Sequence, residues 1–175
     1  MILSRPLPGE FAPAYAPYVA AVPTGDVLAI LQVQSDAVSA LFGGLSEAQA
    51  GFRYAPGKWS MKDLLQHLID AERVFSYRAM RVGRGDTTPL PGYEENAFAA
   101  AAHADHRAMA DLLAEWQAVR AGSQALFRSL PEAAWANVGN ANGVPITARC
   151  FPFLCAGHTA HHLGIIRERY LPAMA

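Results

Sequence analysis

The chain has 175 residues, of which 52% are apolar and 17% are charged, and its formal net charge is −1. This length and composition are typical of one compact domain, residues 1–175, and exclude a disordered chain. Lys and Arg form no basic run, and no stretch has the ~18 apolar residues of a membrane span, so we expect neither nucleic acid nor a membrane as a partner.

The first 23 residues are expected to form an extended arm. Residues 1–23 contain five prolines interleaved with Phe11, Tyr15 and Tyr18. Proline resists helix interiors, so the arm is expected to stay extended and pack its aromatic rings on the body of the protein. Its start is a poor signal peptide, and the only two cysteines lie in an apolar stretch, as reduced core thiols do. We therefore expect a cytoplasmic protein.

Apolar residues at helical spacing predict four long helices after the arm. They cover about residues 26–42, from Ser60 to Val82, 105–129 and 147–170. Ser60 is a suitable N-cap for the second helix and Thr147 for the fourth, which Pro172 ends. No stretch alternates apolar and polar residues long enough to predict a strand. The chain is therefore expected to be all-α, as a four-helix bundle.

The connection from Gly83 to Ala104 is too long for a hairpin between adjacent antiparallel helices. A crossover along the bundle explains this length. The second and third helices would then run parallel, which gives an up-down-down-up order. A segment of this kind can also cover a pocket.

Two histidines four residues apart near the C-terminus carry the strongest functional signal. His158 and His162 fall in the middle of the apolar stripe of the fourth helix, and His67 lies on the flank of the stripe of the second helix. Three neutral imidazoles can hold one divalent metal ion and leave positions open for water or substrate. From spacing alone, a buried hydrogen-bonded histidine network remains the alternative. His161 lies at the margin of the stripe, as a boundary residue.

Two sequence runs resemble the DinB-like (YfiT-like) superfamily of four-helix bundles. They are Trp59–Glu72, which contains Trp-Ser-Met-Lys-Asp-Leu-Leu-Gln-His, and Gly157–Arg167, which contains Gly-His-Thr-Ala-His-His. The resemblance covers about residues 24–171 and implies the up-down-down-up order. It also implies that His67, His158 and His162 bind a divalent metal, with zinc, nickel and ferrous iron all suited to three nitrogen ligands. Nothing in the family pattern makes His161 a primary ligand.

The resemblance implies three functions, in this order. The first is a thiol S-transferase that joins a low-molecular-weight thiol, such as bacillithiol or mycothiol, to an electrophilic small-molecule substrate. The second is a metal-dependent hydrolase, and the third is a metal-binding stress-response protein without catalysis. No cysteine is placed to act as a nucleophile, so the nucleophile is expected from outside the chain. Similar proteins are frequently homodimers.

Two acidic residues follow His67 on the same predicted helix. Asp70 and Glu72 both resemble the acidic positions that follow the family's histidine, and Asp70, one turn from His67, could orient a ligand or hold a metal-bound water. The alternative is that Asp70 is solvated, or that it forms an ion pair with Arg73 or Arg78.

Polar residues of the long connection could also reach the site. Glu94, Glu95 and Asn96 are candidates for the pocket mouth, although ordinary solvated loop residues are favoured. His103 and His106 are expected as solvated or capping residues.

Overall fold

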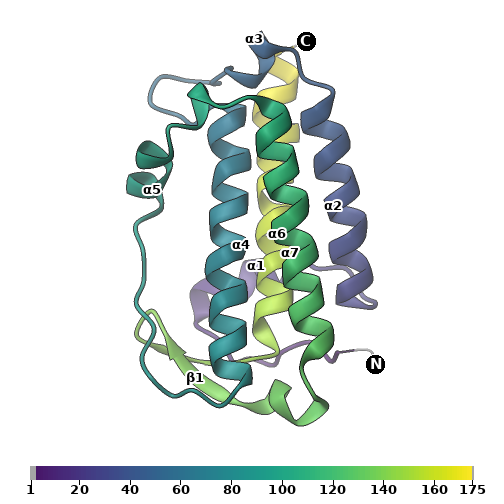
Figure 1. Cartoon of the computed structure of the whole chain (residues 1–175), viewed down its shortest axis with the longest axis vertical. Coiled ribbons are helices and arrows are strands. Elements are labelled where there is room, and N and C mark those ends of the chain that lie inside the picture. The colour runs from purple at the N-terminus through teal and green to yellow at the C-terminus, as the bar shows by residue number, and fades with distance from the viewer. Residues whose placement is uncertain (1–2, 175) are drawn as a thin grey trace.

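The computed structural model describes residues 3–174, so Met1, Ile2 and Ala175, which belong to the predicted arm and domain, lie outside the described residues. Four long helices form a bundle (Figure 1). They are α2 (Val27–Gly43), α4 (Met61–Gly83), α6 (Met109–Ser129) and α7 (Cys150–Ile165), and α7 continues as a π-helical segment, Ile166–Tyr170. Within residues 3–174, no helix is both long and apolar enough to cross a membrane.

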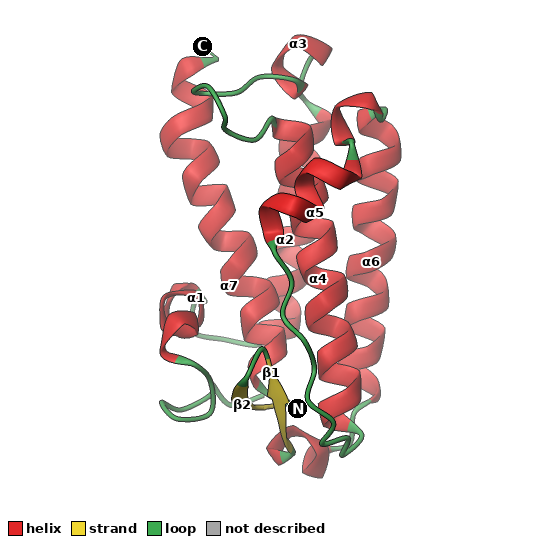
Figure 2. Cartoon of the chain, turned by 90° about the vertical axis from the view of Figure 1, so that its left-hand side faces the viewer, coloured by secondary structure: helices red, strands yellow, loops and turns green. Residues whose placement is uncertain are grey.

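The order of the helices is up-down-down-up, as predicted. In Figure 1, α2 and α7 run upward, and α4 and α6 run downward. Because α4 and α6 are parallel, the chain between them must return along the full length of the bundle, and Figure 2 shows this segment passing along the outside of α4. The predicted fold class is therefore confirmed, although the bundle carries additional short elements.

The short elements lie at the two ends and on the outside of the bundle. They are α1 (Ala16–Ala21), α3 (Glu47–Ala50), α5 (Glu95–Ala102), β1 (Val138–Ala141), β2 (Val144–Thr147) and the 3-10 turns Pro13–Tyr15, Ala104–His106, Glu132–Ala136 and Leu171–Ala173. The expectation of no strand is wrong, because β1 and β2 pair antiparallel. Asn142 and Gly143 connect them with φ values of 55° and 79°, as a two-residue hairpin turn requires.

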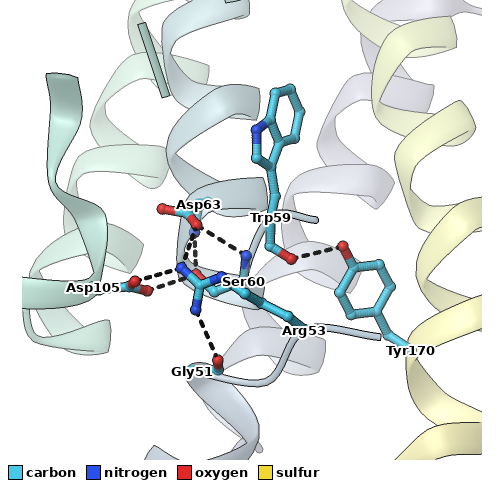
Figure 3. A network of polar contacts seen from close by, with 7 residues as sticks. All are labelled: Gly51, Arg53, Trp59, Ser60, Asp63, Asp105 and Tyr170. Carbon is cyan, nitrogen blue, oxygen red and sulfur yellow. Dashed lines mark hydrogen bonds and ion pairs between the residues drawn. The ribbon is translucent and has the colours of Figure 1, made fainter. Parts of the chain in front are cut away.

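The predicted start of the second helix is confirmed in atomic detail (Figure 3). Ser60 Oγ accepts a hydrogen bond from the backbone N–H of Asp63 at 3.0 Å, and Asp63 Oδ2 accepts one from the Ser60 N–H at 2.9 Å. This reciprocal pair satisfies two N–H groups that the first turn leaves free.

Two other predicted helix starts are wrong. Asp105 lies in a 3-10 turn before α6, where its carboxylate accepts hydrogen bonds from Ser60 Oγ (2.7 Å) and from Arg53. Thr147 is the last residue of β2, and its N–H donates to the backbone oxygen of Glu10 (3.0 Å), so α7 begins only at Cys150. In both places, contacts with distant segments override a local helix signal.

The N-terminal arm is not wholly extended, which corrects the prediction. It contains the helix α1, with Pro17 in the first turn, where a missing N–H costs nothing. This helix packs on α7 at Gly157, where a Cβ atom would lie 2.0 Å from the backbone oxygen of Tyr18. The approach is possible only because residue 157 has no side chain.

A buried arginine joins all four long helices. Arg120 of α6 donates from Nε to Glu72 Oε2 of α4 at 2.9 Å, and from Nη1 to the backbone oxygen of Leu31 in α2 at 2.8 Å. Its Nη2 donates to Thr159 Oγ1 of α7 at 3.1 Å. The partner of Glu72 is therefore an arginine of another helix.

We expect Arg120→Met to lower the free energy of unfolding by about 3–5 kcal/mol, because it leaves the Glu72 carboxylate buried without a counter-charge. The measurement is urea unfolding followed by circular dichroism. The matched control is Arg73→Met, which removes the ion pair of a half-exposed arginine with Glu115 and should cost at most about 1 kcal/mol. Equal losses in the two variants would contradict the structural role of Arg120.

Gly157→Ala should lower the free energy of unfolding by about 1–3 kcal/mol, because the new methyl group forces α1 away from α7. Gly164→Ala is the control on the same helix. A Cβ at residue 164 meets nothing within 4 Å, so that variant should be neutral or more stable by about 0.4–1 kcal/mol. Thermal and urea unfolding of both variants would test this, and a neutral Gly157→Ala would rule out the tight contact.

Candidate metal centre

The structure brings His67, His158 and His162 together between α4 and α7. His158 Nε2 lies 3.0 Å from His67 Nε2 and 3.1 Å from His162 Nε2. All three residues are buried, and within residues 3–174 they form the one cluster of His, Cys, Asp or Glu side chains that is compact enough to hold a metal ion. That they bind a metal stays a prediction.

The local helix geometry accounts for this convergence. His158 and His162 are one turn apart, so their rings lie on one face of α7. His67 occupies a buried position of α4, which packs antiparallel against α7. Two neighbouring helix faces therefore bring three ring nitrogens within 4.8 Å of one another.

Aromatic rings enclose the three imidazoles. The Trp59 ring lies 4.6 Å from that of His67, centroid to centroid, and the rings of Tyr18 and Phe75 meet that of His158 edge-on at 5.5 and 5.9 Å. The hydroxyl of Tyr170 donates to the backbone oxygen of Trp59 at 2.8 Å and so ties this residue to the C-terminal segment (Figure 3). These rings shield the imidazoles from water.

Burial keeps the three imidazoles neutral. Loss of hydration disfavours the charged ring, which lowers the pKa of His67 to about 4 and that of His162 to about 3. The same cause, with the neighbouring imidazoles adding to it, lowers the pKa of His158 well below its ordinary value. At neutral pH each ring therefore keeps a lone pair, and this is the form that binds metals.

The arrangement fits a shared cation better than a hydrogen-bonded network. A neutral Nε2 carries either one proton or one lone pair, so both short contacts of His158 cannot be ordinary hydrogen bonds. Metal–nitrogen bonds of about 2.0–2.1 Å separate two ligand nitrogens by about 2.9 Å at right angles and by about 3.3 Å in a tetrahedral site, and the two short contacts of His158, 3.0 and 3.1 Å, lie between these values. The Nδ1 atom of His162 is buried and has no partner among the described residues.

Asp70 does not reach the imidazoles. Its Oδ1 accepts from Gln66 Nε2 at 3.0 Å and lies 3.8 Å from Arg73 Nη1, so the alternative of an ion pair with Arg73 describes it better. Burial raises the pKa of this carboxyl group. Among residues 3–174, no hydrogen bond links Asp70 to a candidate ligand.

The residues of the long connection divide between two pockets. Glu94 and Glu95 line the same pocket as His158, whereas Asn96 lines a separate pocket with Trp59. His161 is exposed, with its ring 5.1 Å from that of His162. It is therefore a boundary residue, as expected.

Both remaining histidines lie outside the cluster. His103 has a left-handed backbone (φ 49°) and ends α5, and His106 lies in the 3-10 turn that follows. This agrees with the expected capping and solvated positions.

The sequence did not single out two residues that border the centre. Tyr18 comes from the arm, and only its aromatic character pointed to packing. Arg78 is 11 residues after His67, which is just over three turns, so both lie on one face of α4. This spacing from His67 is the sequence pattern that could have placed Arg78 near the centre.

The sequence profile of the DinB superfamily matches residues 30–166 of the chain. No curated protein sequence matches it. Among solved structures, YfiT from Bacillus subtilis, described as "a probable metal-dependent hydrolase with an unusual four-helix bundle topology", is similar with a TM-score of 0.75 at 19% identity. The match covers 92% of each chain.

A mycothiol-dependent maleylpyruvate isomerase is similar with a TM-score of 0.66 at 16% identity, over 82% of this chain and 60% of the isomerase. A variant of it with one histidine replaced by alanine also gives 0.66, at 15% identity, over 87% of this chain and 62% of the other. The chain thus spans less than two thirds of the isomerase, and at these identities the likeness establishes the fold. With the profile match over more than half of its length, the chain belongs to the DinB superfamily.

Proposed function

We propose that this protein is a divalent-metal-dependent enzyme that transfers a low-molecular-weight thiol to an electrophilic small molecule. Its metal, zinc, nickel or ferrous iron, would be held by His67, His158 and His162. The observation that carries this proposal is the convergence of three buried, neutral Nε2 atoms. The dependence of one structural neighbour on mycothiol supports the choice of thiol.

A metal bound here would lower the pKa of a coordinated thiol or water and so supply a nucleophile at neutral pH. The chain's own thiols are unsuitable. Burial raises the pKa of Cys150, and that of Cys155 well above its ordinary value, so both remain protonated. The nucleophile must therefore enter from solvent, and a pocket of about 270 Å³ that includes His158 in its wall gives it room.

Hydrolysis is the second candidate, because the neighbour YfiT is described as a probable metal-dependent hydrolase. Attack by water is helped by a group that accepts its proton. Among the described residues the carboxylates that line the pocket, Glu94 and Glu95, are exposed and make no contact with the imidazoles. A free thiol has a pKa of about 8.5, far below that of water, so a metal can ionise it without such a group, which is why we place thiol transfer first.

A third possibility, a metal-binding stress-response protein, has the same centre without turnover. The homodimer, the cytoplasmic location, the single domain over residues 1–175 and the absence of a nucleic-acid partner stay predictions.

We expect the purified protein to bind one divalent ion per chain when zinc, nickel or ferrous iron is offered. His158→Ala should weaken metal binding by about 100-fold or more, because it removes the central nitrogen of the three. His161→Ala is the matched control, an exposed imidazole one position from His162, and should bind metal as the wild type does. Elemental analysis and calorimetric titration provide the measurement.

The same three proteins decide the reaction. Conjugation of a chromogenic electrophile that needs both the metal and an added thiol, and that is lost in His158→Ala, supports the transferase. Ester or amide turnover without thiol would favour the hydrolase, and stoichiometric metal with neither activity would leave the binding protein. A wild type that retains none of the three metals would overturn the whole proposal.

The metal-free protein should become less stable as the pH falls from about 6.5 to about 4. In this range the unfolded chain protonates imidazoles whose pKa values the fold lowers, to about 4 for His67, to about 3 for His162 and well below the ordinary value for His158, so the unfolded state binds more protons. Each of the three lowers the free energy of unfolding by about 1.4 kcal/mol per pH unit across its window. Urea titrations in chelator at pH 7, 6 and 5 would measure the slope, and His67→Gln should flatten it by one imidazole's share. An unchanged slope in that variant would contradict the burial of His67 as a neutral ring.

A further inference from the structure

We propose that Arg78 binds the carboxylate of a small monocarboxylate substrate in the pocket beside His158. That this carboxylate belongs to the substrate of the metal centre rests on the proposed function. Carboxylate binding by Arg78 rests on the geometry of the pocket alone.

Arg78 is a buried cation without a counter-charge. It is 4% exposed, and its one hydrogen bond runs from Nη2 to the backbone oxygen of Pro91 at 2.6 Å. No carboxylate of the described residues lies within 4.0 Å of it, whereas the equally buried Arg120 has Glu72. A buried guanidinium is costly unless an anion or several acceptors satisfy it. The remaining N–H groups of Arg78 are therefore available to a ligand.

The guanidinium belongs to the pocket that the candidate centre opens into. Arg78 and His158 line the same space of about 270 Å³. Phe75 lines it as well, and its ring meets that of His158 at 5.9 Å. One small molecule can therefore contact Arg78 at one end and the imidazole cluster at the other.

The chemistry of the pocket selects an organic carboxylate. The planar fork of a guanidinium matches the two oxygens of a carboxylate. Tyr15, Tyr18 and Tyr93 supply aromatic walls for the body of the ligand. The pocket is at the small end of ligand-binding cavities, which favours a compact molecule.

Two glutamates at the same pocket limit the charge of the ligand. Glu94 and Glu95 are both exposed, and Glu94 Oε2 is engaged by the N–H of Ala97 at 2.9 Å, where it caps α5. Solvent screens these carboxylates more than it screens the buried Arg78. They would repel a second negative charge at the mouth, so the ligand carries one carboxylate rather than two.

The test uses the metal-free full-length protein and three probes, butyrate, its neutral counterpart butyramide, and the dianion succinate. Calorimetric titration should give binding of butyrate that is about tenfold or more tighter than binding of butyramide or succinate. Arg78→Met, which keeps the length of the side chain, should abolish the preference for butyrate over butyramide. Arg78→Lys should retain part of it.

Two outcomes would overturn the inference. They are equal binding of butyrate and butyramide by the wild type, and an Arg78→Met variant that folds and keeps the preference. If Arg78→Met fails to fold because the contact with Pro91 is lost, the wild-type comparison and Arg78→Lys still decide. The titration uses metal-free protein, so its result does not depend on metal binding. A protein that prefers butyrate but binds no metal would refute the proposed function and leave the carboxylate site supported.

Discussion

The bundle depends on one buried ion pair that reaches every long helix. Arg120 of α6 contacts Leu31 in α2, Glu72 in α4 and Thr159 in α7. Thr159 directly follows His158, and Glu72 lies little more than one turn from His67, so the contacts that satisfy Arg120 also set the register of α4 against α7. Three imidazoles can share a point only at that register. The stability of the core and the geometry of the candidate centre therefore have a common origin.

The two buried arginines, Arg120 and Arg78, have different surroundings. Arg120 is neutralised by Glu72 inside the core, whereas Arg78 faces a pocket with one backbone oxygen as partner. The three imidazoles are uncharged because burial holds their pKa values low. The same region of the interior thus holds imidazole lone pairs that suit a cation and a guanidinium that suits an anion. A metal and a monocarboxylate would meet both.

Much of the architecture could be predicted from the sequence, because it depends on local patterns or on motifs shared by the family. Apolar spacing predicts the long helices, and two histidines one turn apart predict a shared face of α7. Contacts between distant segments could not be predicted. Glu72 and Arg120 are 48 positions apart in the sequence. Asp105 lies outside α6 and accepts hydrogen bonds from Ser60 and Arg53, which come from earlier segments. The prolines of the arm suggested extension, yet a first helical turn accepts them. The Asn142–Gly143 turn signal was present, but its four-residue strands are too short to show alternation.

The contact of α1 with Gly157 has a consequence for how the protein is made. One wall of the pocket comes from Tyr15 and Tyr18, near the beginning of the chain, and it rests on a helix near the end. During synthesis the early segment leaves the ribosome long before α7 exists, and such sequence-distant contacts form slowly. The first helix therefore stays undocked until α7 has been synthesised. A polypeptide that stops before α7 cannot close this pocket.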